Sequence, residues 1–212
     1  LYVRSAQAEE RVRHRVSARE PLSVRDFTEA DAYAAVRLAT LDLATTGVTT
    51  TVEWAAGFGP AYVRGSLAAL SDSGLRFAFA YFGSADPRVQ DDIRLVKRTL
   101  VDPNPRASLQ IGAQPTVFSP FREGLEASAA LARSLGVQLH VHLLENAAQR
   151  EERQMEALAA ANALGPNLLA AHAIHLTDAE LDTLASNGVR ALHCPLSNMR
   201  LAAGVLRPQQ LK

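Results

Sequence analysis

Imidazole side chains gather in one part of this sequence and recur at the ends of short apolar runs. Five of the six histidines lie between residues 140 and 193. Three of them stand at the end of successive runs: His142 in 137–143, His172 in 168–174 and His193 in 189–194. Imidazole is the side chain best suited to bind a transition metal or to move protons near neutral pH. The three histidines therefore indicate a metal-binding or acid–base site.

A carboxylate accompanies these histidines. Glu145 follows His142 by three residues, just past the end of an apolar run, where the chain can turn back over the edge of a sheet. Two roles are open for Glu145. It could complement the positive N-terminal end of a helix expected at 147–164, or it could act with His142 and His172 as a general acid and base. The neighbouring imidazoles favour the second role.

The remaining histidines are expected to have structural roles. His140 shares a strand face with His142 but lies one layer deeper, so a hydrogen-bonded core position is expected rather than metal ligation. His175 does not fall on the inward-facing positions of its predicted strand, so we expect it to stabilise the following loop or the start of the next helix. His14 lies in an opening segment without hydrophobic periodicity, where a solvated side chain is expected.

These candidate residues are positioned by a regular alternation of strands and helices. A run rich in β-branched residues predicts a strand at 48–54, and short apolar runs predict strands at 75–82, 109–114, 137–143, 168–174 and 189–194. Amphipathic segments predict helices from 31 to 47 and at 61–70, 89–100, 123–135, 147–164 and 178–186. Capping signals mark helix starts at Thr28 with Asp31 and at Thr177 with Glu180. Gly74, Gly136 and Gly188 stand where helices should end.

Strict alternation of helices with strands buried on both faces predicts a parallel sheet. No glycine-rich phosphate loop follows the first strand, which argues against a nucleotide-binding fold. Alternation along a strand places Leu168, Ala170 and His172 on one face, and Val189, Ala191 and His193 on one face of the next strand. Small apolar residues below a histidine are typical of an inward barrel face. The expected fold class is α/β, a parallel (β/α) TIM-type barrel with about six of its eight strands in this chain.

The composition narrows the classes of partner. The chain has 212 residues, 48% of them hydrophobic, and its 22 basic and 22 acidic residues cancel. No net field favours nucleic acid, an anionic membrane or a polyanionic substrate, so a small neutral partner is expected. The single cysteine, Cys194, cannot form an internal disulfide. Without a signal peptide or a membrane-spanning run, a cytoplasmic location is expected.

Three segments resemble, in order and spacing, the signature of the amidohydrolase superfamily: HLLE at 142–145, AAHAIHLT at 170–177 and HCPLSNMRL at 193–201. TGVTT at 46–50 is also similar to the segment that leads into the second strand in that family. The resemblance covers about residues 28 to 208. The branch it resembles contains cytosine, guanine and S-adenosylhomocysteine deaminases and the triazine hydrolases.

The resemblance implies roles for individual residues. His142 would bind the metal, Glu145 would shuttle protons, and His172 would contact the activated water or the substrate. His193 could face the substrate. Gln114, followed by Pro115, stands where members acting on adenosine-type substrates often have a histidine, so we expect Gln114 to contact a substrate that is not a nucleoside. The implied cofactor is one divalent metal ion, with Zn²⁺ the best match and Fe²⁺ or Mn²⁺ as alternatives.

The family pattern also has parts that this sequence lacks. The His-x-His pair of the first strand and the metal-binding aspartate of the eighth are absent. Residues 1–27 look like the loop or extension that follows a missing first strand, and Lys212 comes before the eighth strand would begin. Residues 28–212 are therefore expected to form a partial barrel domain. Leu1 is not an initiator methionine, which suggests a piece of a longer protein.

The implied reaction is hydrolytic deamination of an aminated N-heterocycle of the nucleobase, pterin or triazine type by a metal-activated water. Two alternatives are open. The chain could be a catalytically incomplete barrel segment that serves as a binding or scaffold subunit, or it could hydrolyse another C–N or a C–Cl bond. Open sheet edges with exposed apolar surface also predict a homo-oligomer.

Overall fold

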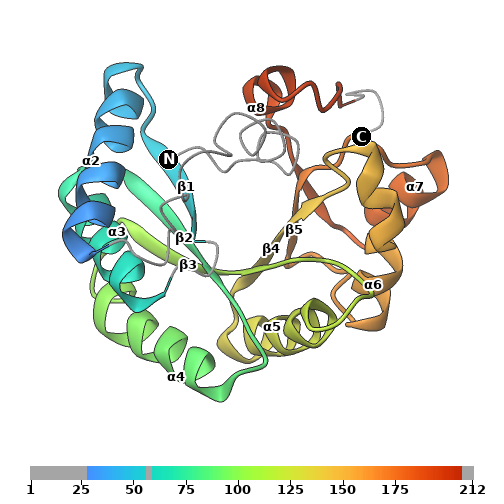
Figure 1. The fold of residues 1–212 in the computed structure, drawn as a ribbon, viewed down its shortest axis with the longest axis horizontal. Coiled ribbons are helices and arrows are strands. Elements are labelled where there is room, and N and C mark those ends of the chain that lie inside the picture. Colours follow the sequence, from blue (N-terminus) through green and yellow to red (C-terminus); the bar gives the residue numbers. More distant parts are fainter. Residues whose placement is uncertain (1–27, 56–58, 207–212) are drawn as a thin grey trace, which may run out of the picture. The chain divides into compact units, whose positions relative to one another are not determined.

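The protein is a parallel α/β structure, described here by a computed structural model over residues 28–55 and 59–206. Six strands form one sheet in the order β1-β2-β3-β4-β5-β6 (Figure 1). The strands are β1 Thr50–Ala55, β2 Arg76–Phe82, β3 Ala107–Ala113, β4 Gln138–Leu143, β5 Leu168–His172 and β6 Arg190–Leu192. The pairings β1–β2, β3–β4, β4–β5 and β5–β6 are parallel. Sequential parallel strands are the arrangement of a TIM-type barrel, which confirms the predicted fold class.

Helices separate the strands. They are α2 Glu29–Thr45, α3 Pro60–Asp72, α4 Pro87–Val96, α5 Phe121–Leu135, α6 Gln154–Ala160, α7 Asp178–Ser186 and α8 Pro195–Arg200. A π-helix, η2 Lys97–Val101, follows α4, and a 3₁₀ helix, η3 Ala147–Glu152, precedes α6. None of the helices in the described part of the chain is long and apolar enough to cross a membrane. The extension predicted for residues 1–27 lies outside the described residues, as do residues 207–212 of the predicted domain.

The predicted capping signals are present in the structure. The Thr28 hydroxyl accepts a hydrogen bond from the Asp31 backbone N–H at 3.2 Å, and the Asp31 carboxylate accepts from the Thr28 N–H at 3.0 Å. Thr177 and Glu180 form the same reciprocal pair at the start of α7. Gly136 ends α5 with a φ of 64°, a left-handed conformation that glycine adopts without a Cβ penalty. Local sequence therefore fixes where these helices begin and end.

Two predicted helices differ from the structure. The single helix expected at 147–164 is divided into η3 and α6, because Arg153 has a φ of 52° and interrupts the helical hydrogen-bond ladder. The helix expected at 89–100 becomes a π-helix after Val96. The last strand is also shorter than predicted, since β6 ends at Leu192 and leaves His193 outside it.

The chain forms two compact units. The first contains α2, β1, α3 and most of β2, together with Val96–Leu109. In this unit α2 packs closely on α3: a Cβ added at Gly65 would lie 2.2 Å from the Glu29 carbonyl oxygen. The buried Tyr62 hydroxyl of α3 donates to the Glu53 carboxylate of β1 at 2.6 Å, and burial raises the pKa of Glu53.

The second unit contains Phe82–Leu95 and the chain from Gln110 onward, and it holds all of the candidate site residues that the structure describes. Its core is built from strand residues with almost no exposed surface: Leu139, Val141, Leu143, Leu168 and Ala170. Parallel strands buried on both faces are typical of sheets covered by helices. This core supports the carboxyl ends of β4 and β5, where the site lies.

Candidate active site

The imidazoles of His142 and His172 meet at the carboxyl ends of β4 and β5. Their ring centroids are 5.1 Å apart and the rings are nearly perpendicular, at 87°. The strand register pairs His142 with Ala171, and Leu143 with His172. Strict alternation would therefore place the His172 side chain on the face of Leu143 rather than that of His142. The backbone instead leaves the extended conformation at His172 (φ 70°) and Ala173 (φ 51°), which brings the two rings together.

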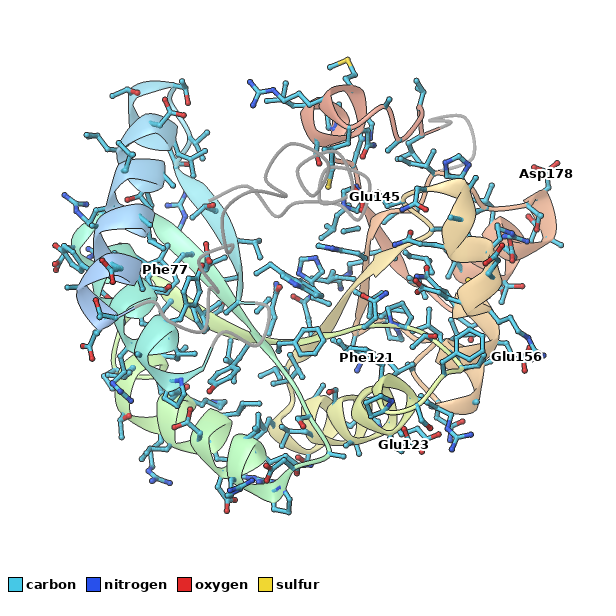
Figure 2. All side chains as sticks on the ribbon, in the orientation of Figure 1. Phe77, Phe121, Glu123, Glu145, Glu156 and Asp178 are labelled. Atoms are coloured by element: carbon cyan, nitrogen blue, oxygen red, sulfur yellow. The ribbon has the colours of Figure 1, made fainter. Side chains whose placement is uncertain are left out.

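Glu145 follows β4 and is buried (Figure 2). Its Oε1 lies 3.7 Å from His172 Nε2, and both side chains are less than one-tenth exposed. This is the position predicted from the sequence, with the carboxyl group turned back toward the strand ends. This separation is longer than a direct hydrogen bond, so proton transfer between the two groups requires a small closing movement.

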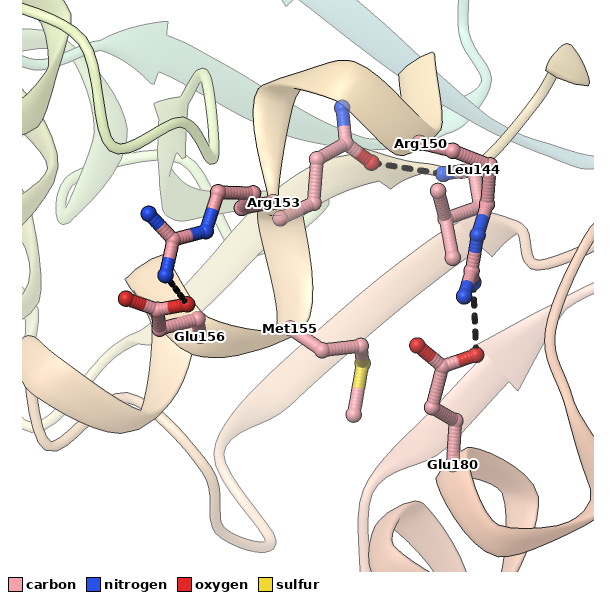
Figure 3. Close-up of a pocket in the computed structure, with 7 residues that line it drawn as sticks. Leu144, Arg150, Arg153, Met155, Glu156 and Glu180 are labelled. Carbon is pink, nitrogen blue, oxygen red and sulfur yellow. Dashed lines mark hydrogen bonds and ion pairs between the residues drawn. The ribbon is translucent and has the colours of Figure 1, made fainter. Parts of the chain in front are cut away.

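A strained turn at Leu144 carries Glu145 to this position. Leu144 has a φ of 44°, which L-residues with side chains rarely adopt. Its N–H donates to Gln154 Oε1 at 2.7 Å, the contact drawn as a dashed line at Leu144 in Figure 3. Its carbonyl oxygen accepts from the backbone N–H groups of Ile174 (3.3 Å) and His175 (3.1 Å). Hydrogen bonds on both sides of the residue therefore hold the turn between the ends of β4 and β5.

The residues after Glu145 are fixed by a second set of hydrogen bonds. The Glu145 N–H donates to Gln149 Oε1 at 2.6 Å. Asn146 caps η3, with its Oδ1 accepting from the Gln149 N–H at 3.2 Å. The Gln149 side chain thus accepts a hydrogen bond from the backbone of Glu145. Through this contact, η3 fixes the backbone from which the Glu145 carboxyl group extends.

Buried amides also orient two of the imidazoles. His172 Nδ1 lies 2.8 Å from Asn198 Oδ1, and His140 Nδ1 lies 2.9 Å from Gln110 Oε1. His140 is thus a buried, hydrogen-bonded residue, as the sequence predicted. His175 is also in a structural position, with its Nε2 at 2.7 Å from the Ala203 carbonyl oxygen.

Burial controls the protonation of the site. Burial, with a smaller contribution from the neighbouring His172, lowers the pKa of His142 to about 3 and that of His140 to about 4. Both rings are therefore neutral at physiological pH, which is the form that can bind a metal. Burial raises the pKa of Glu145, while His172 opposes the shift. A carboxyl group with a raised pKa is suited to carry protons near neutral pH.

Two predicted substrate contacts lie apart from this cluster. Gln114 directly follows β3, and its Nε2 donates to Glu152 Oε2 at 3.0 Å. The same carboxylate oxygen accepts from Gln154 Nε2 at 2.9 Å, so Gln114 is tied to the network behind the Leu144 turn. His193 is exposed just after β6. The substrate roles of Gln114 and His193 stay predictions, and His14 lies outside the described residues.

Five side-chain amides in the site were not predicted from the sequence: Gln110, Asn146, Gln149, Gln154 and Asn198. Asn198 lies within the HCPLSNMRL segment, so its motif was a usable signal. Gln154 and Gln110 had no such signal, because an isolated glutamine is usually a solvated side chain. Each amide contacts a partner from another part of the chain or a turn that local patterns do not predict.

The donor set is only part of a metal site. The described residues contain no group of three or more His, Cys, Asp or Glu side chains placed to hold a metal ion. His142 and His172 have the right chemistry, as buried imidazoles at strand ends, but a catalytic zinc normally needs at least three protein ligands. A pocket near Leu144 does not add to the site: it is lined by Arg150, Arg153, Gln154, Met155, Glu156 and Glu180, with each arginine paired to a glutamate (Figure 3).

The structure thus belongs to the class of parallel α/β proteins that gather imidazole and carboxyl groups at the carboxyl ends of neighbouring strands. The profile of the amidohydrolase family matches residues 10–211, and the chain belongs to that family. The resemblance stated from the sequence motifs is confirmed.

Several relatives in other organisms are deaminases. The chain is 32% identical over 154 residues to a 5-methylthioadenosine/S-adenosylhomocysteine deaminase of Nitratidesulfovibrio vulgaris, a match covering 66% of this chain and 35% of the relative. It is 35% identical over 114 residues to an 8-oxoguanine deaminase of Pseudomonas aeruginosa, covering 50% of this chain and 25% of the relative. The matched region therefore spans well under half the length of these relatives.

A solved structure shares the fold. The chain superimposes on atrazine chlorohydrolase from Arthrobacter aurescens TC1, complexed with zinc, with a TM-score of 0.76 and 20% identity, over 87% of this chain and 47% of the other. At this identity the likeness supports the TIM-type fold and not a shared substrate.

Proposed function

We propose that this chain contributes part of the active site of a metal-dependent hydrolase that deaminates aminated N-heterocycles. The observation that carries the proposal is the buried Glu145 carboxyl group, which lies 3.7 Å from His172 Nε2, while the His172 ring contacts the neutral imidazole of His142. A buried carboxyl group with a raised pKa is costly for stability alone and useful for proton transfer. The similarity to proteins named as deaminases supports the reaction class.

In this proposal His142 is one ligand of a divalent metal ion, with zinc the best match for imidazole donors. When bound, such a metal lowers the pKa of a water molecule toward about 7 and so supplies hydroxide at neutral pH. The described residues do not complete the ligand set. The further ligands therefore come from outside the described part of the chain.

Glu145 carries the protons. Its carboxylate removes a proton from the attacking water and delivers it to a ring nitrogen, which makes the adjacent carbon electrophilic. A second proton, from the hydroxyl group now on the ring carbon, passes through Glu145 to the departing amino group. The carbon–nitrogen bond breaks, ammonia leaves, and the ring carbon keeps the water oxygen. His172 Nε2 hydrogen-bonds to the nucleophile or steadies the developing charge.

The proposed substrate is a small aminated heterocycle of the purine type, since the relatives are named for adenosine derivatives and for 8-oxoguanine. Gln114 and His193 are the proposed substrate contacts on this chain. Gln114 stands where family members that act on adenosine-type substrates often have a histidine. We therefore propose a free base, rather than a nucleoside, as the substrate. A cytoplasmic location and a homo-oligomeric state belong to the same proposal.

The test is ammonia release by the full-length, zinc-loaded protein. The panel contains 5-methylthioadenosine, S-adenosylhomocysteine, 8-oxoguanine and a chlorinated triazine. Ammonia from the aminated compounds supports the proposal, and the base-to-nucleoside ratio identifies the substrate class. Chloride release alone would favour C–Cl hydrolysis. Binding without release of either product would favour the scaffold alternative.

A further inference from the structure

A buried amide on α8 contacts the imidazole that faces Glu145. Asn198 is 2% exposed and His172 is 5% exposed, and Asn198 Oδ1 lies 2.8 Å from His172 Nδ1. An amide oxygen can only accept a hydrogen bond, so the imidazole must donate it. His172 Nδ1 therefore carries a proton.

This contact determines whether the other ring nitrogen, Nε2, donates or accepts a hydrogen bond. A neutral imidazole carries one proton, so with Nδ1 protonated, Nε2 has a free lone pair. Nε2 is the atom that lies 3.7 Å from Glu145 Oε1. The opposite tautomer would present an N–H at this position and would turn a lone pair against the Asn198 oxygen, which is unfavourable in a buried site.

The Asn198 amide is itself held in place by α8. The Asn198 N–H donates to the Cys194 carbonyl at 2.9 Å, and its carbonyl accepts from the Ala203 N–H at 2.9 Å. In the described part of the chain, its Nδ2 has no hydrogen-bond partner. The hydrogen bond to His172 is thus the polar contact that the described structure gives this buried side chain.

We infer that Asn198 is a positioning residue that fixes His172 in the Nδ1–H tautomer, so that Nε2 faces Glu145 as a hydrogen-bond acceptor. The catalytic consequence rests on the proposed function, because it assumes that His172 and Glu145 act together on a nucleophile or substrate. The tautomer itself does not depend on any reaction. It follows from the contact between two buried side chains.

The test reads the tautomer directly. Long-range ¹H–¹⁵N NMR of the full-length, zinc-loaded, ¹⁵N-labelled protein separates the protonated from the unprotonated ring nitrogen, and His172→Gln assigns the signal. Wild type and Asn198→Asp, which keeps an acceptor oxygen, should show Nδ1–H. Asn198→Leu should lose this preference. Asn187→Leu, an exposed asparagine at the end of α7, is the matched control and should leave the His172 signal unchanged.

In the same variants, deaminase turnover should fall on the order of 10- to 100-fold for Asn198→Leu, the range typical of residues that orient a catalytic or ligating histidine. Turnover should be largely kept in Asn198→Asp. An Nε2–H tautomer in wild type, or an unchanged tautomer in Asn198→Leu, overturns the inference. If Asn198→Leu does not fold, the wild-type and Asn198→Asp spectra decide. An Nδ1–H signal without ammonia release would count against the proposed function and leave the inference standing.

Discussion

Burial has opposite effects on the acid and base groups of the site. It lowers the pKa of His142, which keeps the imidazole neutral and able to bind a metal, and it raises the pKa of Glu145, which makes the carboxyl group a stronger base. Burial of the site thus favours metal binding by His142 and proton transfer by Glu145. Single substitutions can separate them, because ligation and proton transfer belong to different residues.

Glu145→Gln should keep the fold and the metal while lowering turnover by on the order of 10² or more, because the amide cannot accept and release a proton. The measurement is the steady-state rate of ammonia release together with metal content by mass spectrometry. Unchanged turnover would remove Glu145 from the mechanism.

His142→Ala should instead lose the metal, because it removes a proposed ligand and leaves the carboxyl group in place. Metal content is measured against wild type at the same free zinc concentration. His140→Gln is the control, since His140 is a buried neighbour that is hydrogen-bonded to Gln110. Full metal occupancy in His142→Ala would show that the ligand lies elsewhere.

Among the elements, the junction between β4 and β5 is the part that sets the site geometry. Leu144, His172 and Ala173 all have positive φ angles at the two strand ends. Such conformations persist only where surrounding contacts hold them, and here Gln154 and the backbone of Ile174 supply those contacts. The α6 helix therefore acts on the site through one amide.

Gln154→Met keeps the side-chain length but removes the acceptor of the Leu144 N–H. The unfolding free energy should fall by about 1–3 kcal/mol, the cost of an unsatisfied buried donor, and turnover should fall because the Glu145 turn loosens. Met155→Leu, one residue further along α6, is the control and should change both little. Turnover equal to wild type in Gln154→Met would show that the turn does not depend on this amide.

The α2–α3 packing tolerates no side chain at Gly65, where an added Cβ would lie 2.2 Å from backbone. Gly65→Ala should destabilise the protein by about 1–3 kcal/mol through overpacking. Gly124→Ala in α5 is the control: an added Cβ there meets nothing within 4 Å, and alanine should stabilise the helix by about 0.5–1 kcal/mol. Chemical denaturation measures both, and equal stabilities would contradict the predicted contact.

At the scale of the whole molecule, the region that matches the deaminase relative covers 35% of that relative's length, and the described residues of this chain offer no group of three metal ligands. Residues 1–212 expressed alone should therefore hold far less than one equivalent of zinc, because one or two imidazoles cannot fix the coordination geometry. Metal analysis of the purified segment, with circular dichroism to confirm folding, makes the measurement. Near one equivalent of zinc with ammonia release would show that the ligand set was misjudged.

The alternation of strands and helices, the caps at Thr28 and Thr177, and the placement of His142 and Glu145 near the end of β4 can all be predicted from the sequence. These features depend on contacts between residues a few positions apart. Periodicity, capping pairs and a strand end are all visible at that range.

The contacts between the side chains of the site could be found only in the folded structure. The hydrogen bond between His172 and Asn198 joins residues 26 apart, and that between His140 and Gln110 joins residues 30 apart. The sheet register pairs His172 with Leu143 rather than with His142, yet the His142 and His172 rings are in contact where His172 and Ala173 have positive φ angles at the end of β5. Such backbone conformations are stabilised by neighbours that the folded sheet brings together, so no local pattern encodes them.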